Sequence, residues 1–132
     1  MEAFTQALLE ALAAATGLPQ EDLRLESPRN PDLGDFAFPC FPLAKALRKA
    51  PPAIAAELAP QLAERLEGIS VEATGPYLNF RVDRALLART VVGAVLAAGE
   101  AYGSSDQGAG KTVVIDLSSP NIAKPMSVGH LR

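Results

Sequence analysis

A polar, glycine-rich segment near residue 103 divides the sequence into two unequal parts. The stretch "GSSDQGAGK", Gly103–Lys111, offers only Ala109 as an apolar side chain, so it cannot contribute to a core. We therefore predict a first domain over residues 1–103, a linker over 104–111 and the start of a second domain over 112–132. With 48% hydrophobic and 20% charged residues, the 132-residue chain has the composition of a globular protein that buries one ordinary core.

Charge and cysteine content exclude several classes of protein. A formal net charge of -3 gives no general attraction to nucleic acid, so an RNA partner would require a local basic patch. The single cysteine, Cys40, has no partner for a disulfide or a metal site, and we interpret it as a core residue and predict no metal. The apolar run Val91–Ala98 is far shorter than the roughly 20 residues of a membrane span, and "MEAFTQ" lacks the basic region of a signal peptide. We expect a cytoplasmic protein without a membrane partner.

The apolar periodicity of residues 1–103 predicts an α+β fold, in which helices pack on a small antiparallel sheet. Apolar stripes predict helices over residues 2–16, from about 43 to the prolines at 51 and 52, from there to about 67, and from 84 to about 99. The segment 69–82 predicts a hairpin with strands at 69–73 and 77–82, joined at Gly75 and Pro76. We also expect short strands at 23–26 and 36–38 around an irregular surface segment rich in Pro, Gly, Asn and Asp. The last helix is expected to carry an apolar face formed by Leu86, Leu87, Val91, Ala94 and Val95.

After the linker, the sequence predicts a phosphate site. Thr112–Leu117, "TVVIDL", is β-branched without alternation, which is typical of a strand buried on both faces of a parallel sheet. The loop that follows leads into a helix, where free backbone N–H groups and the helix dipole favour an anion. Gly129 would let a ligand approach the backbone closely. The side chains of this loop that can donate hydrogen bonds are Asn121, Lys124, Ser127 and His130. Together they predict a loop that holds a nucleotide phosphate and stabilises charge during displacement at phosphorus.

The pattern "SSPNIAKPMSVGHLR" resembles the HIGH signature region of the arginyl-tRNA synthetases, a class I family in which H-x-G-H follows P-N-x-x-K-P. The matching positions are Pro120, Asn121, Lys124, Pro125, Gly129 and His130. One position departs from the pattern: Ser127 stands where the family has the first signature histidine, so a neutral hydroxyl replaces an imidazole.

The resemblance implies roles for the residues of this loop. ATP would be a substrate, accompanied by magnesium, and the catalytic residues that contact its phosphates would be His130, Lys124 and Ser127. The residues implied for binding of the arginine substrate are Asn121, Ser119 and Gly129. Ser127 is equally well explained as a helix N-cap, and Asn121 after a proline as a turn residue.

The remainder of the chain also resembles this family. The segments "GDFAFPCFPLAKALRKAPPAIAAEL" and "GPYLNFRVD" are similar to its extra N-terminal domain, which contacts tRNA(Arg) at the D-loop. The resemblance implies an arginine–tRNA ligase with tRNA(Arg), ATP and L-arginine as partners, and we expect a monomer. Residues 112–132 would supply only the first strand and HIGH-type loop of its Rossmann-like catalytic fold. We therefore expect a truncated product that is inactive alone.

The second hairpin strand predicts an RNA-binding face. Tyr77 and Asn79 alternate with Leu78 and Phe80, so we expect them to be exposed together. An exposed aromatic ring beside an exposed amide can stack on a splayed base and bind its edge. The basic residues expected to reach RNA phosphates are Arg81 on the same face, and Lys45 and Arg48 of a helical cluster with Lys49. The alternatives are that Tyr77 covers the core edge, Asn79 faces water and the cluster is a solvated face.

Other functions remain open at this point. "GAGKT" suggests a P-loop, but Ser105 stands where that motif has glycine, and the order of helix before strand is reversed. The alternatives that the sequence leaves are a nucleotidyltransferase of the HxGH type and a non-catalytic RNA or protein interaction module.

Overall fold

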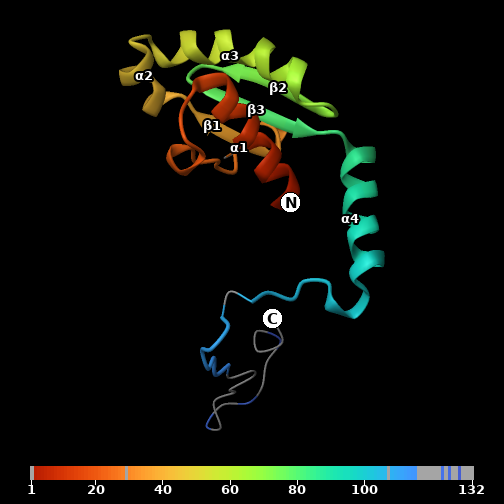
Figure 1. Ribbon diagram of the computed structural model, residues 1–132. Helices are drawn as coiled ribbons and strands as arrows, with labels where there is room; N and C mark the ends of the chain where they lie inside the picture. The colour runs from red at the N-terminus through yellow and green to blue at the C-terminus, as the bar shows by residue number, and fades with distance from the viewer. Residues whose placement is uncertain are drawn as a thin grey trace. The chain divides into compact units, whose positions relative to one another are not determined.

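The computed structural model describes residues 2–28, 30–106, 108–115, 123, 125 and 128. The chain divides into two units, Met1–Ala98 and Gly99–Arg132. The first unit has the predicted α+β fold (Figure 1). Its elements are α1 (Glu2–Thr16), η1 (Gln20–Asp22), η2 (Pro31–Leu33), β1 (Phe36–Pro39), α2 (Phe41–Leu47), α3 (Pro51–Arg65), β2 (Ile69–Thr74), β3 (Tyr77–Val82) and α4 (Arg84–Ala98). In the part of the chain that is described, no helix is long and apolar enough to cross a membrane.

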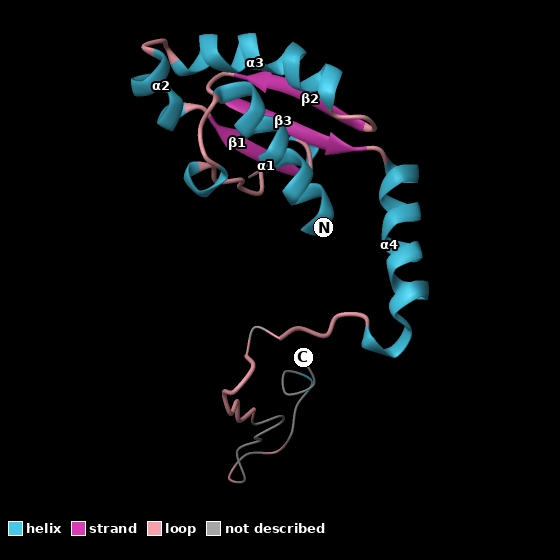
Figure 2. Cartoon of the chain, in the orientation of Figure 1, coloured by secondary structure: helices cyan, strands magenta, loops and turns pink. Residues whose placement is uncertain are grey.

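The three strands form one antiparallel sheet in the order β1-β3-β2 (Figure 2). The predicted hairpin is confirmed: β2 pairs with β3 from Ile69 opposite Val82 to Thr74 opposite Tyr77. Gly75 has a φ of 55°, a left-handed conformation that suits glycine in a tight turn. β1 pairs with the other edge of β3, from Phe36 opposite Phe80 to Pro39 opposite Tyr77. The strand expected at 36–38 is therefore also confirmed, and β3 lies in the centre of the sheet.

One face of the sheet carries the hydrophobic core. Leu78, Phe80 and Val82 alternate along β3, and all three are buried in one cluster with residues of α1 and α3. The helical members of the cluster include Leu8, Leu12, Ile54 and Leu62, each at 0–1% exposure. Truncating a side chain of this kind to alanine typically costs about 2–5 kcal/mol of stability.

The predicted helix ends have clear local causes. Gly17 follows α1 with a φ of 74°, so α1 ends where glycine can adopt the left-handed conformation. α2 ends at Arg48, which has a φ of 51° and is the only non-glycine residue with positive φ among the described positions. α3 then begins with Pro51, because proline suits the first turn of a helix. Cys40 is completely buried, as the sequence predicted.

Three expectations from the sequence are wrong. The strand at 23–26 is reduced to a single bridge, Glu26 to Ala37, and at its start the Leu23 N–H donates to the Gln20 carbonyl of η1 instead of to a strand. Residues 112–115 are exposed and form no strand, and no segment of the described chain pairs with them. α4 forms as predicted, but only Leu86 and Leu87 of its apolar face pack on the core. Further along that face, Val95 remains 39% exposed.

Candidate functional site

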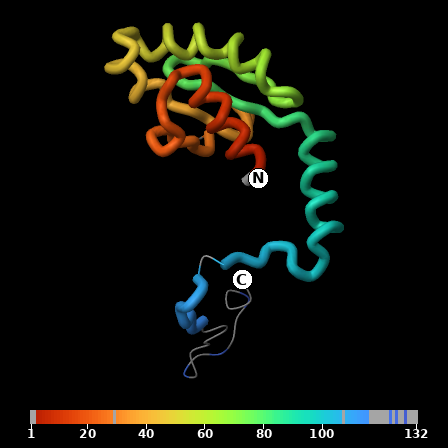
Figure 3. Tube along the Cα trace, in the orientation of Figure 1, coloured from red at the N-terminus to blue at the C-terminus, as the bar shows by residue number. Residues whose placement is uncertain are grey.

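The segment 26–35, of which residue 29 is not described, follows α1 and η1 and leads into β1; Figure 3 traces the chain through it. At its start, Glu26 and Ala37 exchange two backbone hydrogen bonds of 2.8 Å. At its end, the Asp35 N–H donates to the Phe80 carbonyl at 2.7 Å, and the Asp35 carboxylate accepts from the Val82 N–H at 2.9 Å. The segment is thus fixed at both ends against the sheet.

Gly34 lets this segment lie close to β3. Its φ is 150°, and a Cβ at this position would come within 2.6 Å of the Phe80 carbonyl oxygen. No L-amino acid with a side chain fits there without moving the backbone, because the neighbouring atom belongs to the central strand. The close approach of the segment to the sheet therefore depends on glycine.

Between this segment and the sheet lies a pocket of about 320 Å³, which we call the hairpin pocket. Its lining residues are Glu26, Ser27, Pro28, Leu33, Ala37, Thr74, Tyr77 and Asn79. Tyr77 lines it and is 36% exposed, whereas Asn79 is only 4% exposed. The Nδ2 of Asn79 is buried and has no hydrogen-bond partner in the described part of the chain. A buried donor without an acceptor is costly, so this amide is suited to a ligand that brings an acceptor.

The structure confirms that Tyr77, Asn79 and Arg81 share one face of β3, but the expected exposure of Asn79 is wrong. Its partner positions in the sheet are Ala37 on β1 and Glu72 on β2, so it occupies the central strand. The segment 26–35 then closes over it, with Leu33 and Pro28 among the pocket walls. Asn79 is therefore not a surface amide but a buried one.

Arg81 is less free than the sequence indicated. Its Nη2 donates to the backbone carbonyl of Asp32 in η2, so the guanidinium connects β3 to the segment 26–35, which we call the covering segment.

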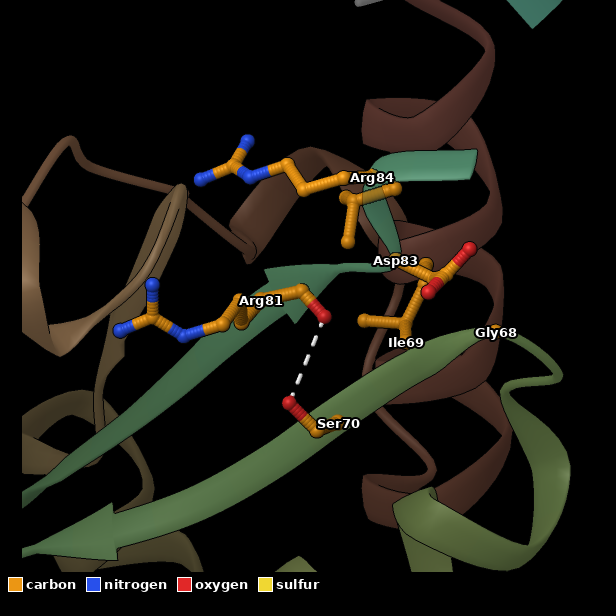
Figure 4. A pocket seen from close by; sticks show the side chains of 7 residues that line it. Gly68, Ile69, Ser70, Arg81, Asp83 and Arg84 are labelled. Carbon is orange, nitrogen blue, oxygen red and sulfur yellow. Dashed lines mark hydrogen bonds between the residues drawn. The ribbon is translucent and has the colours of Figure 1, made fainter. Parts of the chain in front are cut away.

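Arg84 lies next to Arg81 in this region and forms an ion pair with Asp35 at 3.1 Å. In Figure 4 both guanidinium groups extend to the same side of the hairpin, beside a second hollow of about 490 Å³. The one hydroxyl in that hollow, Ser70 Oγ, already donates to the Arg81 carbonyl at 3.4 Å, so the hollow lacks a buried group that needs a ligand.

The basic cluster is also smaller than predicted. Lys45 lies in the last turn of α2, but Arg48 caps that helix and Lys49 follows it. Lys49 forms an ion pair with Glu57 of α3, with Nζ 2.6 Å from Oε2. Lys45 and Arg48 are exposed and form no ion pair with a described residue, which leaves them available to an anionic partner.

A residue that the sequence did not single out lies next to the pocket. Phe41, the first residue of α2, contacts the ring of Tyr77 edge to face, with ring centroids 5.8 Å apart and planes at 84°. It is 53% exposed. Thr74 was also missed, because the predicted strand ended at residue 73; in the structure it pairs with Tyr77. The walls from the segment 26–35 carry no pattern that would reveal them, because the irregular backbone that places them depends on distant contacts.

The predicted phosphate site falls on a part of the chain that the structure leaves out. Its residues Ser119, Asn121, Lys124, Ser127, Gly129 and His130 all lie outside the described residues. Their roles therefore stay predictions. Among the residues that are described, no cluster of His, Cys, Asp and Glu could hold a metal ion.

Comparisons with known proteins match both parts of the chain to arginyl-tRNA synthetases. Residues 2–82 match the family described as "Arginyl tRNA synthetase N terminal domain", and residues 91–132 match "tRNA synthetases class I (R), catalytic domain". Proteins named arginine–tRNA ligase from two Streptococcus pyogenes strains, of serotypes M5 and M18, are 55% identical over 108 residues. These alignments cover 82% of this chain and 19% of each relative.

A solved structure gives the same relationship in three dimensions. The arginyl-tRNA synthetase of Thermus thermophilus is 36% identical and superposes with a TM-score of 0.53, over 66% of this chain and 15% of that one. Both matches are to models of arginyl-tRNA synthetases, which disfavours the nucleotidyltransferase alternative. Because the N-terminal domain match alone spans residues 2–82, more than half of the sequence, the chain belongs to the arginyl-tRNA synthetase family.

Proposed function

We propose that this chain supplies the tRNA-contacting N-terminal part of an arginine–tRNA ligase, and that the hairpin pocket binds one nucleotide of the tRNA(Arg) D-loop. The observation that carries the proposal is the buried Nδ2 of Asn79, which has no partner among the described residues, in a pocket that is also lined by the partly exposed Tyr77. Single-stranded RNA is read by this combination of aromatic stacking and hydrogen bonds to the edge of a splayed base.

The size and chemistry of the pocket fit a base. Its volume of about 320 Å³ lies near the lower end of the range for small-molecule pockets, roughly 300 Å³. Asn79 Nδ2 requires an acceptor, and each base offers carbonyl or ring-nitrogen acceptors on its edges. Pro28, Leu33 and Ala37 supply apolar walls that would exclude water from this hydrogen bond.

Phosphate contacts would come from outside the pocket. The exposed side chains of Lys45 and Arg48 are the candidates, because Lys49 and Arg84 are already paired with carboxylates. Arg81 would act chiefly by holding Asp32 and the covering segment in place. A chain of net charge -3 requires such local contacts to attract RNA.

The C-terminal part is proposed to contribute the HIGH-type loop of the ligase. His130, Lys124 and Ser127 would contact the phosphates of ATP, which magnesium accompanies, during adenylate formation. Asn121, Ser119 and Gly129 would contact L-arginine. The support is the family match over residues 91–132. A protein with these partners would act in the cytoplasm, as a monomer, without a membrane.

Binding of a tRNA(Arg) transcript to the 132-residue chain, measured at several salt concentrations, tests the D-loop proposal. Stacking on a base is worth roughly 1–3 kcal/mol, so Tyr77→Ala should weaken binding roughly five- to 150-fold with little change in salt dependence. Tyr102→Ala is the matched control, because Tyr102 is the only other tyrosine and lies outside the pocket at 50% exposure. If Tyr77→Ala and Asn79→Ala both bind as tightly as the parent chain at every salt concentration, the pocket is not an RNA site.

The phosphate contacts are tested by the salt dependence itself. Each one adds about 0.7–0.9 to the slope of log affinity against log salt. Lys45→Ala should lower that slope by up to this amount and weaken all tRNAs alike. Lys49→Ala should change it less, because Lys49 is paired with Glu57. Equal slopes for all three proteins would show that Lys45 does not contact a phosphate.

A further inference from the structure

We propose that Phe41 forms a second base-stacking surface beside the hairpin pocket, so that the site takes two splayed D-loop nucleotides rather than one. The proposal rests on the D-loop function proposed above. It follows from an aromatic ring that is 53% exposed although it contacts the pocket residue Tyr77. Such a ring offers a free surface for a base, and base–aromatic stacking tolerates any base.

The position of Phe41 is fixed by contacts of the two residues that precede it. It follows Cys40, which is fully buried and whose backbone N–H donates to the Pro76 carbonyl in the hairpin turn at 2.9 Å. It also follows Pro39, which pairs with Tyr77 across the sheet. The start of α2 and the turn that carries Tyr77 are therefore held together. The two rings have a defined relationship before any ligand binds, which lowers the entropic cost of binding.

The angle between the rings indicates what kind of RNA would fit. Their planes lie at 84°, so a base stacked on Phe41 would stand almost perpendicular to a base stacked on Tyr77. Continuous stacking in an RNA helix does not permit this arrangement. A single-stranded loop with bases turned outward does, and such loops are the usual targets of sequence-specific RNA recognition. The partner is therefore a loop with two unstacked nucleotides.

The charge beside Phe41 agrees with an RNA ligand. Lys45 lies four residues further along α2, a spacing that places both side chains on the same face of the helix. Lys45 is exposed and has no ion-pair partner among the described residues. An aromatic surface with a free cation one helical turn away matches the alternation of bases and phosphates along a strand.

The experiment measures binding of the 132-residue chain to an intact tRNA(Arg) transcript and to transcripts that each carry one abasic D-loop position. Phe41→Ala should weaken binding of the intact transcript roughly five-fold or more, as expected for one lost stacking contact. Phe41→Tyr keeps an aromatic ring and should bind like the parent chain. Leu47→Ala is the matched control, since Leu47 is an exposed apolar residue of the same helix at 39% exposure and should change affinity less than about twofold.

The abasic transcripts separate a second stacking surface from mere support of Tyr77. We expect the effect of Phe41→Ala to vanish at one abasic position and that of Tyr77→Ala to vanish at a different one. If both effects vanish at the same position, Phe41 only orients Tyr77, and the proposal is overturned. It is also overturned if Phe41→Ala binds every transcript as the parent chain does, or weakens all of them equally.

The same binding measurements distinguish a failure of the Phe41 proposal from a failure of the hairpin-pocket proposal. In the latter case Tyr77→Ala and Asn79→Ala would bind like the parent chain, whereas Phe41→Ala would still lose its effect at one abasic position. Circular dichroism and urea unfolding of each variant would show whether it is folded, and the half-exposed position of Phe41 leads us to expect that it is.

Discussion

At the scale of single residues, Asn79 combines a cost in stability with the proposed role in tRNA binding, and substitution can separate the two. Its buried Nδ2 has no acceptor among the described residues, which typically costs about 1–3 kcal/mol. Asn79→Leu removes the donor and keeps the branched shape and number of side-chain heavy atoms, so we expect the urea midpoint to stay equal or to rise. The same substitution should weaken tRNA(Arg) binding. A loss of more than about 2 kcal/mol in unfolding free energy would show that the amide is satisfied in the folded chain.

Cys40 provides a second prediction at this scale. Burial raises the pKa of its thiol from 9.0 to about 11, because the thiolate would be desolvated. At pH 8 the folded chain should therefore react with a thiol reagent at least about a hundredfold more slowly than the urea-unfolded chain. The thiol pKa is higher in the folded chain than in the unfolded chain, so the folded state holds the proton more tightly. The stability that follows from this difference is fully present below pH 9 and is lost as the pH rises through 11. Equal rates in the folded and unfolded states would contradict the burial of Cys40.

The same scale shows how far sequence can predict a site. Tyr77, Asn79 and Arg81 could be placed on one face, because the side chains of a strand alternate. The burial of Asn79 could not be foreseen. It results from the covering segment, whose position depends on hydrogen bonds between Asp35 and residues 80 and 82, more than forty positions away in the sequence. Phe41 was missed for a similar reason, since its contact with Tyr77 joins two elements that are distant in sequence.

At the scale of elements, the covering segment 26–35 is the wall of the pocket, and Gly34 controls its distance from the sheet. Gly34→Ala places a Cβ 2.6 Å from the Phe80 carbonyl oxygen at a φ of 150°, so the segment must move away from β3. Gly17→Ala is the matched control, because Gly17 also has a positive φ, of 74°, but nothing lies within 4 Å of an added Cβ. We expect a loss of roughly 1–2 kcal/mol for Gly17→Ala and a larger one for Gly34→Ala in urea unfolding.

RNA binding distinguishes the two glycines further. Gly34→Ala should also reduce discrimination among D-loop variants, since Leu33 and Pro28 move with the segment. Gly17→Ala should leave it unchanged. If Gly34→Ala is no less stable than Gly17→Ala, the contact between the segment and the sheet is not required.

Elements were predicted well where local sequence decides them. α1 has the predicted bounds, because an apolar stripe and Gly17 define it, and the hairpin is set by Gly75 and its alternating strands. The strand at 23–26 was wrong because alternation alone does not supply a pairing partner: only Glu26 pairs with β1, and the Leu23 N–H is used by η1. Residues 112–115 have strong β propensity but remain exposed without pairing, since a parallel strand depends on neighbours for its hydrogen bonds.

At the scale of the whole molecule, the chain spans 19% of the curated relatives that it matches, and this extent bears on activity. Adenylate formation requires ATP and arginine to be held together in one enclosed site. The described residues leading to the proposed loop, Val113 to Ile115, are 70–88% exposed and pack against no core. We expect the 132-residue chain to show no arginine-dependent exchange of pyrophosphate into ATP. Exchange above a His130→Ala control would contradict this prediction.

The division into two units leads us to predict that the first unit is stable without residues 104–132. The buried core consists of residues between Phe4 and Val82, and among the described residues the last one that packs against it is Leu87. A chain that ends at Gly103 should therefore melt within about 2 °C of the 132-residue chain, because little apolar surface changes its exposure. Leu62→Ala, at a fully buried position, serves as the positive control and should lower the midpoint by several degrees. A comparable fall on removing residues 104–132 would show that they contribute to the folding of the first unit, and that the division at the glycine-rich segment is wrong.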